Sequence, residues 1–330
     1  MIRFISAKVF GISILQEYVC VGLEDFRRPL TAYITGTDPS RHFLVSQEIL
    51  LGYKPLIIGI SCDTYSEQTH WLQHQERVCI SFVMKEFVCD MKWNGLATDK
   101  KAVARLILRR VKARELGTTA LFIFEGERGK HRFLTPFHQA TNRVKQRFLA
   151  NKTDNWLPGN LYDQVRIGYA KPRIIALITV YDQTGLMNMF PTDLHGQVGR
   201  NYYAGSLRLG GRATLQIEQS KVIALSQVRD DWYREAYSLG KNHMKDFQAP
   251  DNFFLSPFYS RESGIPLPGS VVCYRELKRI DSLDLGIHRI HFYETLYEER
   301  LSKANSLAHI HCYYAQFRRD QKLLTDYLIR

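Results

Sequence analysis

The chain has 330 residues, of which 45% are hydrophobic and 24% are charged, and its formal net charge is +12. This composition is typical of a globular protein with room for two domains, and the positive charge favours an anionic partner such as a nucleotide, an acidic protein or a nucleic acid. The longest apolar stretches, 55–60 and 174–180, are too short to span a bilayer, and the first residues lack the layout of a signal peptide. We therefore expect no membrane span and a cytoplasmic location.

Short segments rich in β-branched and aromatic residues predict strands throughout the first half. These segments are 3–10, 18–23, 30–35, 56–61, 77–84 and 119–124. Apolar residues at three- and four-residue steps over 99–115 predict an amphipathic helix that Gly117 ends. Its outer face is basic, with Lys100, Lys101, Arg105, Arg109, Arg110, Lys112 and Arg114. No aromatic stacking platform and no known nucleic-acid motif accompany this face, which disfavours nucleic acid as a partner.

The polar segment 151–160 contains Pro158-Gly159 and predicts a domain boundary. We predict one domain over 1–150 and a second over 151–330. The second half again predicts strands, at 173–181, 202–209, 221–228, 270–277, 287–293 and 307–314. A helix is predicted over 231–239, and the proline-rich residues 250–268 predict a long surface loop. Many short strands with few helices favour small β-barrels over a parallel α/β sheet.

Two stretches of the first half recur in the second half. Residues 31–35 match 175–179, and residues 69–83 match 214–228 without a gap. A repeat of this length predicts two like domains rather than a solenoid. Two such domains can pack as the subunits of a homodimer do, with a shared cleft between them.

The residues Gly210-Gly211-Arg212-Ala213-Thr214 have the pattern of a phosphate site. Arg212 offers charged donors, Thr214 offers a hydroxyl, and the glycines let backbone N–H groups approach an anion. Asn188 and Thr192 would add donors from a neighbouring loop. An exposed arginine after two glycines is also common in simple turns, so the pattern leaves both interpretations open.

Two blocks carry a resemblance to a known family. They are Lys171-Pro172-Arg173-Ile174-Ile175-Ala176-Leu177-Ile178-Thr179 and Asp182-x-x-Gly185-x-x-Asn188-x-x-Pro191. Together they resemble the flavin reductase-like group of FMN-binding split barrels. Arg212-x-Thr214-x-x-Ile217 is similar to the family's next block except that its Asn is missing, and 288–294 is similar to a late strand that often carries a His. The resemblance covers residues 160–300 in outline.

The resemblance implies a split β-barrel that holds FMN, or alternatively FAD, at a dimer interface. NADH or NADPH would reduce the flavin, and electrons would pass to free flavin or to an electron-accepting protein. The phosphate would lie on the loop after Asn188 and on the block at 212–214. The implied cofactor-binding residues are Thr179, Asn188, Pro191, Thr192, Asp193, Arg212 and Thr214. No catalytic residue is predicted.

Three features depart from the family pattern. Asp193 stands where the family usually has Ser, and a carboxylate beside a phosphate repels it unless it is neutralised. The stretch 198–203 is bulkier than the family's proline-led strand. The first half keeps Thr35, Asp38 and Thr69 but lacks the Gly-x-x-Asn-x-x-Pro spacing. We therefore expect a flavin only in the second half.

The predicted fold is mainly β, with two tandem split β-barrel domains that form an intramolecular pseudo-dimer. The favoured function is an FMN-binding flavoprotein with NAD(P)H-dependent flavin reductase activity. One alternative is a non-catalytic flavin-binding or scaffold protein, in which duplication and Asp193 have removed the activity. Another is a basic β-barrel protein that binds a polyanionic partner. Further pairing of whole chains is left open.

Histidines and cysteines give no metal site. His309 and His311 would share one face of a strand, but no third ligand with suitable spacing is visible. His288 and His291 would point to opposite faces of a strand, and His195 follows the predicted phosphate loop as a solvated or ligand-contacting side chain. The six cysteines are scattered without a Cys-x-x-Cys spacing, which predicts buried free thiols.

Overall fold

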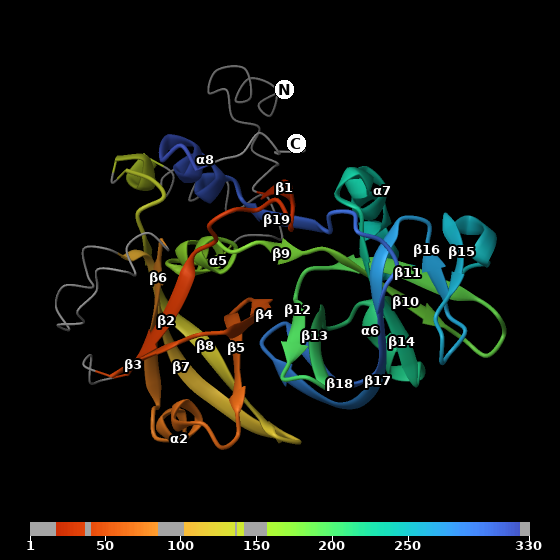
Figure 1. Ribbon diagram of the computed structural model, residues 1–330, viewed down its shortest axis with the longest axis horizontal. Coiled ribbons are helices and arrows are strands. Elements are labelled where there is room, and N and C mark those ends of the chain that lie inside the picture. The colour runs from red at the N-terminus through yellow and green to blue at the C-terminus, as the bar shows by residue number, and fades with distance from the viewer. Residues whose placement is uncertain (1–17, 37–40, 85–101, 136, 142–156, 324–330) are drawn as a thin grey trace.

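The computed structural model describes residues 18–36, 41–84, 102–135, 137–141 and 157–323 (Figure 1). This part of the chain is mainly β and is built around two seven-stranded antiparallel sheets, one from each half. The first sheet contains β2 (Thr31–Thr35), β3 (His42–Leu44), β4 (Gln47–Tyr53), β5 (Leu56–Asp63), β6 (Arg77–Val83), β7 (Ala102–Leu116) and β8 (Thr119–His131), with helix α2 (Glu67–Gln73) between β5 and β6. The second contains β10 (Ala176–Tyr181), β11 (Met187–Thr192), β12 (His195–Val198), β13 (Tyr202–Arg208), β14 (Val222–Val228), β17 (Val271–Leu285) and β18 (His288–Arg300), with helix α6 (Arg212–Gln219) between β13 and β14.

The two sheets have the same strand order. The first runs β3-β2-β6-β7-β8-β5-β4, and the second runs β11-β10-β14-β17-β18-β13-β12. The aligned segments 69–83 and 214–228 accordingly fall on corresponding elements, a short helix followed by a strand. The predicted fold class, tandem split β-barrels in one mainly β chain, is confirmed. An origin by internal duplication stays a prediction.

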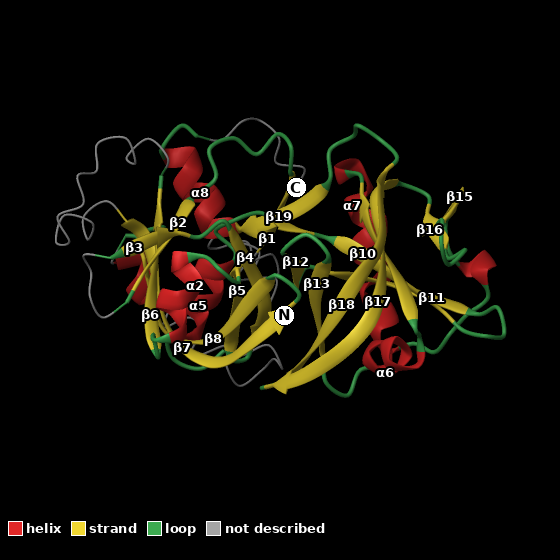
Figure 2. Cartoon of the chain, turned by 60° about the horizontal axis from the view of Figure 1, so that its bottom comes forward, coloured by secondary structure: helices red, strands yellow, loops and turns green. Residues whose placement is uncertain are grey.

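A third sheet joins parts of the chain that lie far apart in sequence. It has the order β1 (Tyr18–Gly22), β19 (Leu307–His311) and β9 (Arg173–Ile174). Figure 1 shows it along one side of the molecule, above the place where the two barrels meet. After β19 the chain turns into helix α8 (Cys312–Asp320), on the side of the first barrel (Figure 2).

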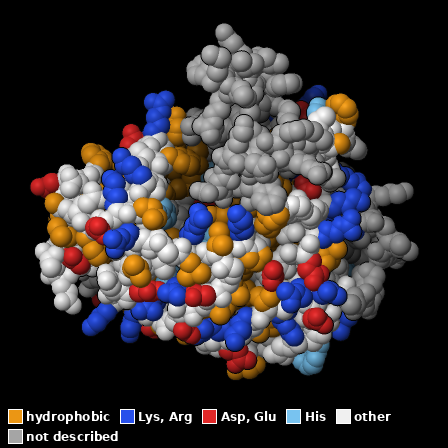
Figure 3. Space-filling view, turned by 180° about the vertical axis from the view of Figure 1, so that it is seen from behind, with side chains coloured by type: hydrophobic (Ala, Val, Ile, Leu, Met, Phe, Trp, Pro, Cys, Tyr) orange, Lys and Arg blue, Asp and Glu red, His pale blue; other side chains and the backbone are white. Residues whose placement is uncertain are grey.

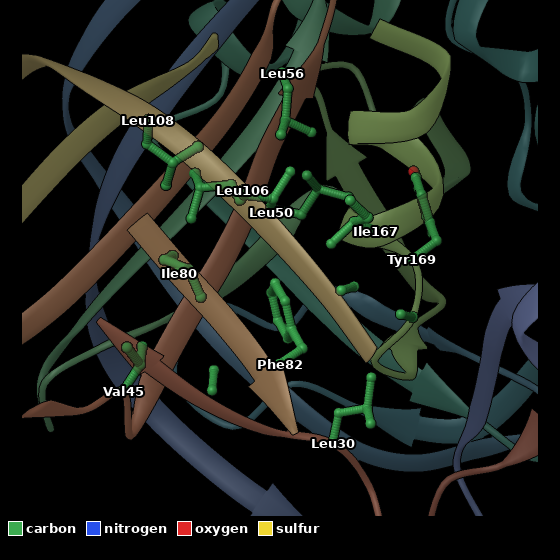
Figure 4. Close-up of a cluster of buried hydrophobic side chains, with 14 of the residues drawn as sticks. Leu30, Val45, Leu50, Leu56, Ile80, Phe82, Leu106, Leu108, Ile167 and Tyr169 are labelled. Atoms are coloured by element: carbon green, nitrogen blue, oxygen red, sulfur yellow. The ribbon is translucent and has the colours of Figure 1, made fainter. Parts of the chain in front are cut away.

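Helix α5 (Leu161–Gly168) packs on the first barrel, although it follows the predicted boundary. Ile167 and Tyr169 lie in the same buried cluster as Leu50 and Leu106 of the first sheet (Figure 4). The division into domains at residue 150 stays a prediction. In the structure, α5 and Tyr169 pack against the first barrel.

The two barrels meet through an apolar layer that forms the pseudo-dimer interface. The first barrel contributes Ile49, Leu51, Ile57, Leu116, Leu121 and Ile123, and the second contributes Val198, Ala204, Ile290 and Phe292. On β4 these residues alternate with Leu50, which faces the core of its own barrel. Both faces of β4 are therefore buried, one in the barrel and one in the interface.

The prediction of a basic helix over 99–115 is wrong, because residues 102–116 form strand β7. Leu106 and Leu108 are buried, whereas Ile107 and Arg109 are exposed, which is the two-residue period of a strand. The apolar residues also fit a helical spacing, so the sequence alone favoured the wrong element. Pairing with β6 on one side and β8 on the other satisfies the backbone of β7 and decides the outcome.

Most of the other predicted strands are present, while the segment 3–10 lies outside the described residues. The short strands β3, β4, β11 and β12 and the helices α2, α5, α6 and α8 were not predicted. The helix expected over 231–239 is a run of η3 (Asp230–Trp232), α7 (Tyr233–Ser238) and η4 (Leu239–Met244). The loop expected over 250–268 contains η5 (Pro250–Asn252) and a hairpin of β15 (Leu255–Tyr259) and β16 (Pro266–Pro268). Within the described ranges, no helix has the length and apolar character needed to cross a membrane.

Candidate functional site

The loop between β13 and α6 places two arginines at the start of a helix. Gly210 has φ +78, a region that favours glycine, and Gly211 is the N-cap of α6. Arg212 is the first residue of α6, and its guanidinium lies 3.4 Å from the carboxylate of Asp246, with both side chains exposed. Arg208, the last residue of β13, is exposed and forms no ion pair with any described residue. The carbonyl of Arg208 accepts from the Gly211 N–H at 3.4 Å, so both arginines attach to the loop that opens α6, and a cation at the positive end of a helix suits an anion.

Asn188 and Thr214 use their side chains inside the protein. The Asn188 Nδ2 donates to the Oε1 of Gln216 at 2.7 Å and to the carbonyl of Asn242 at 3.0 Å. The Thr214 hydroxyl donates to the carbonyl of Arg208 at 2.9 Å. These bonds hold β11 and the loop before α6 in place. They give both residues a structural role, and direct contact with a cofactor stays a prediction.

Thr179, Pro191 and Thr192 lie on the paired strands β10 and β11. Thr179 is fully buried, and its hydroxyl has no hydrogen-bond partner among the described residues. The Pro191 carbonyl accepts from the Nε2 of His243 at 2.8 Å, and the Thr192 hydroxyl oxygen accepts from the backbone N–H of Leu194 at 3.4 Å. The strand pair thus carries the chain to Asp193 in a fixed position.

Asp193 joins β11 to β12 and is the centre of a polar cluster. Its Oδ2 accepts hydrogen bonds from the Tyr169 hydroxyl at 2.7 Å and from the His309 Nε2 at 2.8 Å. Burial alone would raise the pKa of this carboxyl, but the bond and charge of His309 and the bond from Tyr169 bring the pKa to about 2. Asp193 is therefore an anion at neutral pH, and donors from the protein satisfy its Oδ2.

Several histidines near the interface are buried and neutral. His195 donates from Nε2 to the carbonyl of Ile174 at 3.0 Å, and its Nδ1 accepts from the Tyr203 hydroxyl at 2.7 Å, so it is not a solvated loop residue. Burial lowers the pKa of His195, His288 and His291 to about 4 in each case. The ring nitrogens of His288 and His291 have no hydrogen-bond partner in the described part of the chain.

His288 and His291 point to opposite faces of β18, as predicted. The His288 ring lies 4.6 Å from the ring of Tyr53, a residue of the first barrel. The His291 ring lies 6.2 Å from that of Tyr293, inside the second barrel. His309 and His311 share one face of β19, because both rings contact Tyr18. Of these histidines, His288 reaches the first barrel and His309 reaches Asp193.

Three segments meet where the end of β13 faces the first barrel, and we call this place the second-barrel junction. It consists of Arg208, the turn 286–288 between β17 and β18, and the hairpin tip 53–55 between β4 and β5. The backbone N–H of Ile287 donates to the carbonyl of Lys54 at 3.2 Å. A Cβ added to Gly286 would lie 2.3 Å from the Pro55 Cδ. The hairpin tip therefore closes directly on the turn.

The corresponding place on the first barrel is open, and we call it the first-barrel junction. In the first barrel, the backbone N–H of Thr64 donates to the carbonyl of Thr118 at 2.9 Å. The equivalent bond in the second barrel runs from the N–H of Leu209 to the carbonyl of Ile287 at 2.8 Å. A cavity of about 450 Å³ lies here, between the two barrels. It is lined by Ser46, Gln47, Ser61, Cys62, Asp63, Gly117, Thr118, Thr119, Gly199, Arg200, Asn201 and Tyr202. None of the predicted cofactor residues lines this cavity. Its walls come from four separate segments that are brought together only by the fold, so a local sequence pattern does not reveal it.

Many of the basic residues that favoured a polyanionic partner are paired on the sheet. Arg77 bonds to Glu127 at 3.1 Å, and Arg109 bonds to Glu125 at 3.1 Å. Arg110 donates to the carbonyl of Leu72 at 2.6 Å. Figure 3 shows acidic and basic side chains interspersed over the face that it draws. These pairs weaken the positive field that a polyanion would need.

Five cysteines fall among the described residues, and all five are free thiols. Burial raises the pKa of Cys62, in the cavity wall, to about 12, so this thiol is protonated at neutral pH. The described residues contain no group of His, Cys, Asp and Glu side chains that could hold a metal ion.

Comparison with solved structures finds flavin-related proteins over part of this chain. The NADH:FAD oxidoreductase of Streptomyces globisporus is 14% identical, with a TM-score of 0.40, over 48% of this chain and 93% of its own. The flavin reductase component of a bacterial two-component tryptophan halogenase is 16% identical, with a TM-score of 0.39, over 46% of this chain and 92% of its own. An FMN-binding protein from Thermus thermophilus is 12% identical, with a TM-score of 0.35, over 45% of this chain and 78% of its own. No family model and no curated protein matches the chain.

Proposed function

We propose that the chain is an FMN-binding flavoprotein whose bound flavin is reduced by NADH or NADPH, with FAD as the alternative cofactor. The observation that carries this proposal is the placement of two exposed arginines at the ends of one loop, Arg208 at the end of β13 and Arg212 at the start of α6. The same stretch of chain carries the sequence resemblance to FMN-binding split barrels. When bound, the flavin supplies the hydride chemistry, and the protein binds and orients it.

The residues of the second-barrel junction would hold different ends of the ligand. Arg208 and Arg212, together with the first N–H groups of α6, would hold the phosphate. The rings of Tyr53 and the neutral His288 now meet edge to face at 4.6 Å, and either ring would contact a flat ligand ring if they separated. Binding here requires the hairpin tip 53–55 to give way, because it now closes on Gly286. Asp193 would repel the phosphate and must therefore face another part of the ligand.

Replacing Arg212 by alanine should weaken FMN binding by about 10- to 100-fold, in line with the loss of a charge-assisted contact. Riboflavin has no phosphate, so its affinity should stay the same in this variant. Quenching of flavin fluorescence measures both affinities. Arg200→Ala is the matched control, because Arg200 is also exposed but lies in the wall of the first-barrel junction. A loss of FMN binding in the control alone would place the flavin in that cavity and contradict the assignment.

Two observations favour a second candidate, a non-catalytic flavin-binding or scaffold protein. The side chains of Asn188 and Thr214 are already hydrogen-bonded within the protein. The second-barrel junction is also closed by the hairpin tip. An absorbance spectrum of the purified protein with added FMN, after gel filtration, separates the two. Retained flavin bands together with NAD(P)H oxidation support the reductase, and retained bands without turnover support the binding protein. A colourless protein excludes a flavin role. An electron-accepting protein partner, further pairing of chains and a cytoplasmic location stay predictions.

A further inference from the structure

The two oxygens of the Asp193 carboxylate are used differently. Oδ2 accepts both hydrogen bonds, from Tyr169 at 2.7 Å and from His309 at 2.8 Å. Oδ1 accepts none from the described residues, and the Asp193 side chain is 24% exposed. A carboxylate has lone pairs on both oxygens and can accept several hydrogen bonds. Oδ2 is thus bonded to the protein, while Oδ1 is free to accept a hydrogen bond from a ligand.

His309, one of the two donors to Asp193, is itself held by further hydrogen bonds. A carboxylate only accepts, so the His309 Nε2 must donate, and the Nδ1 of the same ring lies 3.0 Å from the Tyr237 hydroxyl. The Cys20 thiol in turn donates to the Tyr237 oxygen at 3.6 Å. Tyr237 thus supports the ring of His309, which in turn donates to Asp193. The arrangement fixes both the charge and the direction of the carboxylate.

Asp193 lies beside the end of β13, where the second-barrel junction begins, because the backbone N–H of Ser206 donates to the carbonyl of Leu194, the residue after Asp193, at 2.8 Å. Burial raises the pKa of Tyr53, and Asp193 raises it further against the effect of Arg208. Burial lowers the pKa of His288, and Asp193 opposes that effect. Tyr53 belongs to the first barrel and His288 to the second. The two rings lie 4.6 Å apart, so a ligand enters between them only when the hairpin tip 53–55 moves, and it then lies close to Asp193.

We propose that Asp193 selects the ligand at the second-barrel junction, with Oδ1 accepting a hydrogen bond from a neutral N–H group. A ligand with an acceptor or a negative charge at this point is rejected, because two acceptors repel each other and leave the carboxylate unpaired. This inference rests on the proposed function, and the donor that it assigns is the imide N–H of the flavin ring. Tyr169 and His309 act through Asp193 and are positioning residues.

The unchanged protein provides the first test, with two flavins that lack the ribityl chain. Lumiflavin has the imide N–H, and 3-methyllumiflavin has a methyl group in its place. Lumiflavin should bind about 10- to 100-fold more tightly, as expected for one charge-assisted hydrogen bond. Equal affinities would overturn the assignment. A preference for riboflavin over lumiflavin with no effect of the methyl group would name a ribityl hydroxyl as the donor, which also overturns it.

Asp193→Asn replaces the accepting oxygen Oδ1 with a donating amide group. The amide oxygen can keep the bonds from Tyr169 and His309, so the amide N–H₂ faces the ligand in place of an acceptor. Lumiflavin should lose about 10-fold or more in affinity, whereas 3-methyllumiflavin should not. Asp251→Asn is the matched control, because it removes an exposed carboxylate outside the second-barrel junction and should keep the discrimination. Circular dichroism checks that each variant is folded.

The outcomes for the two proposals remain separate. If no flavin binds to the unchanged protein, the proposed function fails. If both flavins bind without discrimination, only the role of Asp193 fails. If the variant at Asp193 does not fold, the role of Asp193 is tested by comparing the two flavins on the unchanged protein.

Discussion

Replacing Glu48 by glutamine should lower the free energy of unfolding by about 3 to 5 kcal/mol. The Glu48 side chain on β4 is fully buried, with Oε1 2.5 Å from Arg173 and Oε2 3.4 Å from Lys171. Arg173 also donates to the carbonyl of Gly168 at 2.8 Å and is itself mostly buried. The substitution leaves two cations together without their carboxylate. Urea denaturation followed by circular dichroism measures the loss.

The matched control is Glu67→Gln, because Glu67 pairs with Arg41 on the surface, where the two side chains are 70% and 56% exposed. An exposed pair of this kind contributes less than about 1 kcal/mol. Equal losses in the two variants at neutral pH would contradict the role given to Glu48.

The contribution of Glu48 should also depend on pH. Burial alone would raise the pKa of Glu48, but Lys171 and Arg173 hold it below its ordinary value of 4.5. As the pH falls below this ordinary value, the unfolded chain binds a proton that the folded protein does not, and folding loses the contribution. The difference in stability between the unchanged protein and Glu48→Gln should therefore be full above that pH and shrink below it.

The repeat explains why the fold class could be predicted from the sequence. The match between 69–83 and 214–228 covers a helix and the strand after it, which is a local unit whose pattern survives in each copy. Strand β7 could not be predicted in the same way. Its residues fit two periods, and the choice between them came from pairing with β6 and β8, which the local pattern does not contain.

The candidate site was predictable only where neighbours in sequence form it. The glycines before Arg212 predicted a turn with a cation, and the structure has a helix start there. The sequence resemblance placed Asp193 among the cofactor-binding residues as a carboxylate that needs a neutralising partner, but it could not identify that partner, because His309 lies 116 residues away on β19. The Tyr169 hydroxyl and the first-barrel junction were likewise missed. Contacts of this kind depend on how whole sheets pack, and a local pattern carries no trace of them.

Replacing Gly286 by alanine should lower the free energy of unfolding by about 2 to 5 kcal/mol, since it combines backbone strain with overpacking. Gly286 has φ +59, and an added Cβ would lie 2.3 Å from the Pro55 Cδ and 2.4 Å from the Lys54 carbonyl oxygen. The contact joins the turn between β17 and β18 to the hairpin tip of the other barrel. Chemical denaturation measures the loss.

Gly264→Ala separates the two causes. Gly264 has φ +63, almost the same backbone strain, but nothing lies within 4 Å of an added Cβ. This control should lose only about 1 to 2 kcal/mol, and the excess in Gly286→Ala reports the contact between the barrels. That contact is also what closes the second-barrel junction, so a hairpin tip pushed away from Gly286 should open it. Gly286→Ala should therefore bind FMN more tightly while it is less stable, whereas general loosening would weaken both properties together.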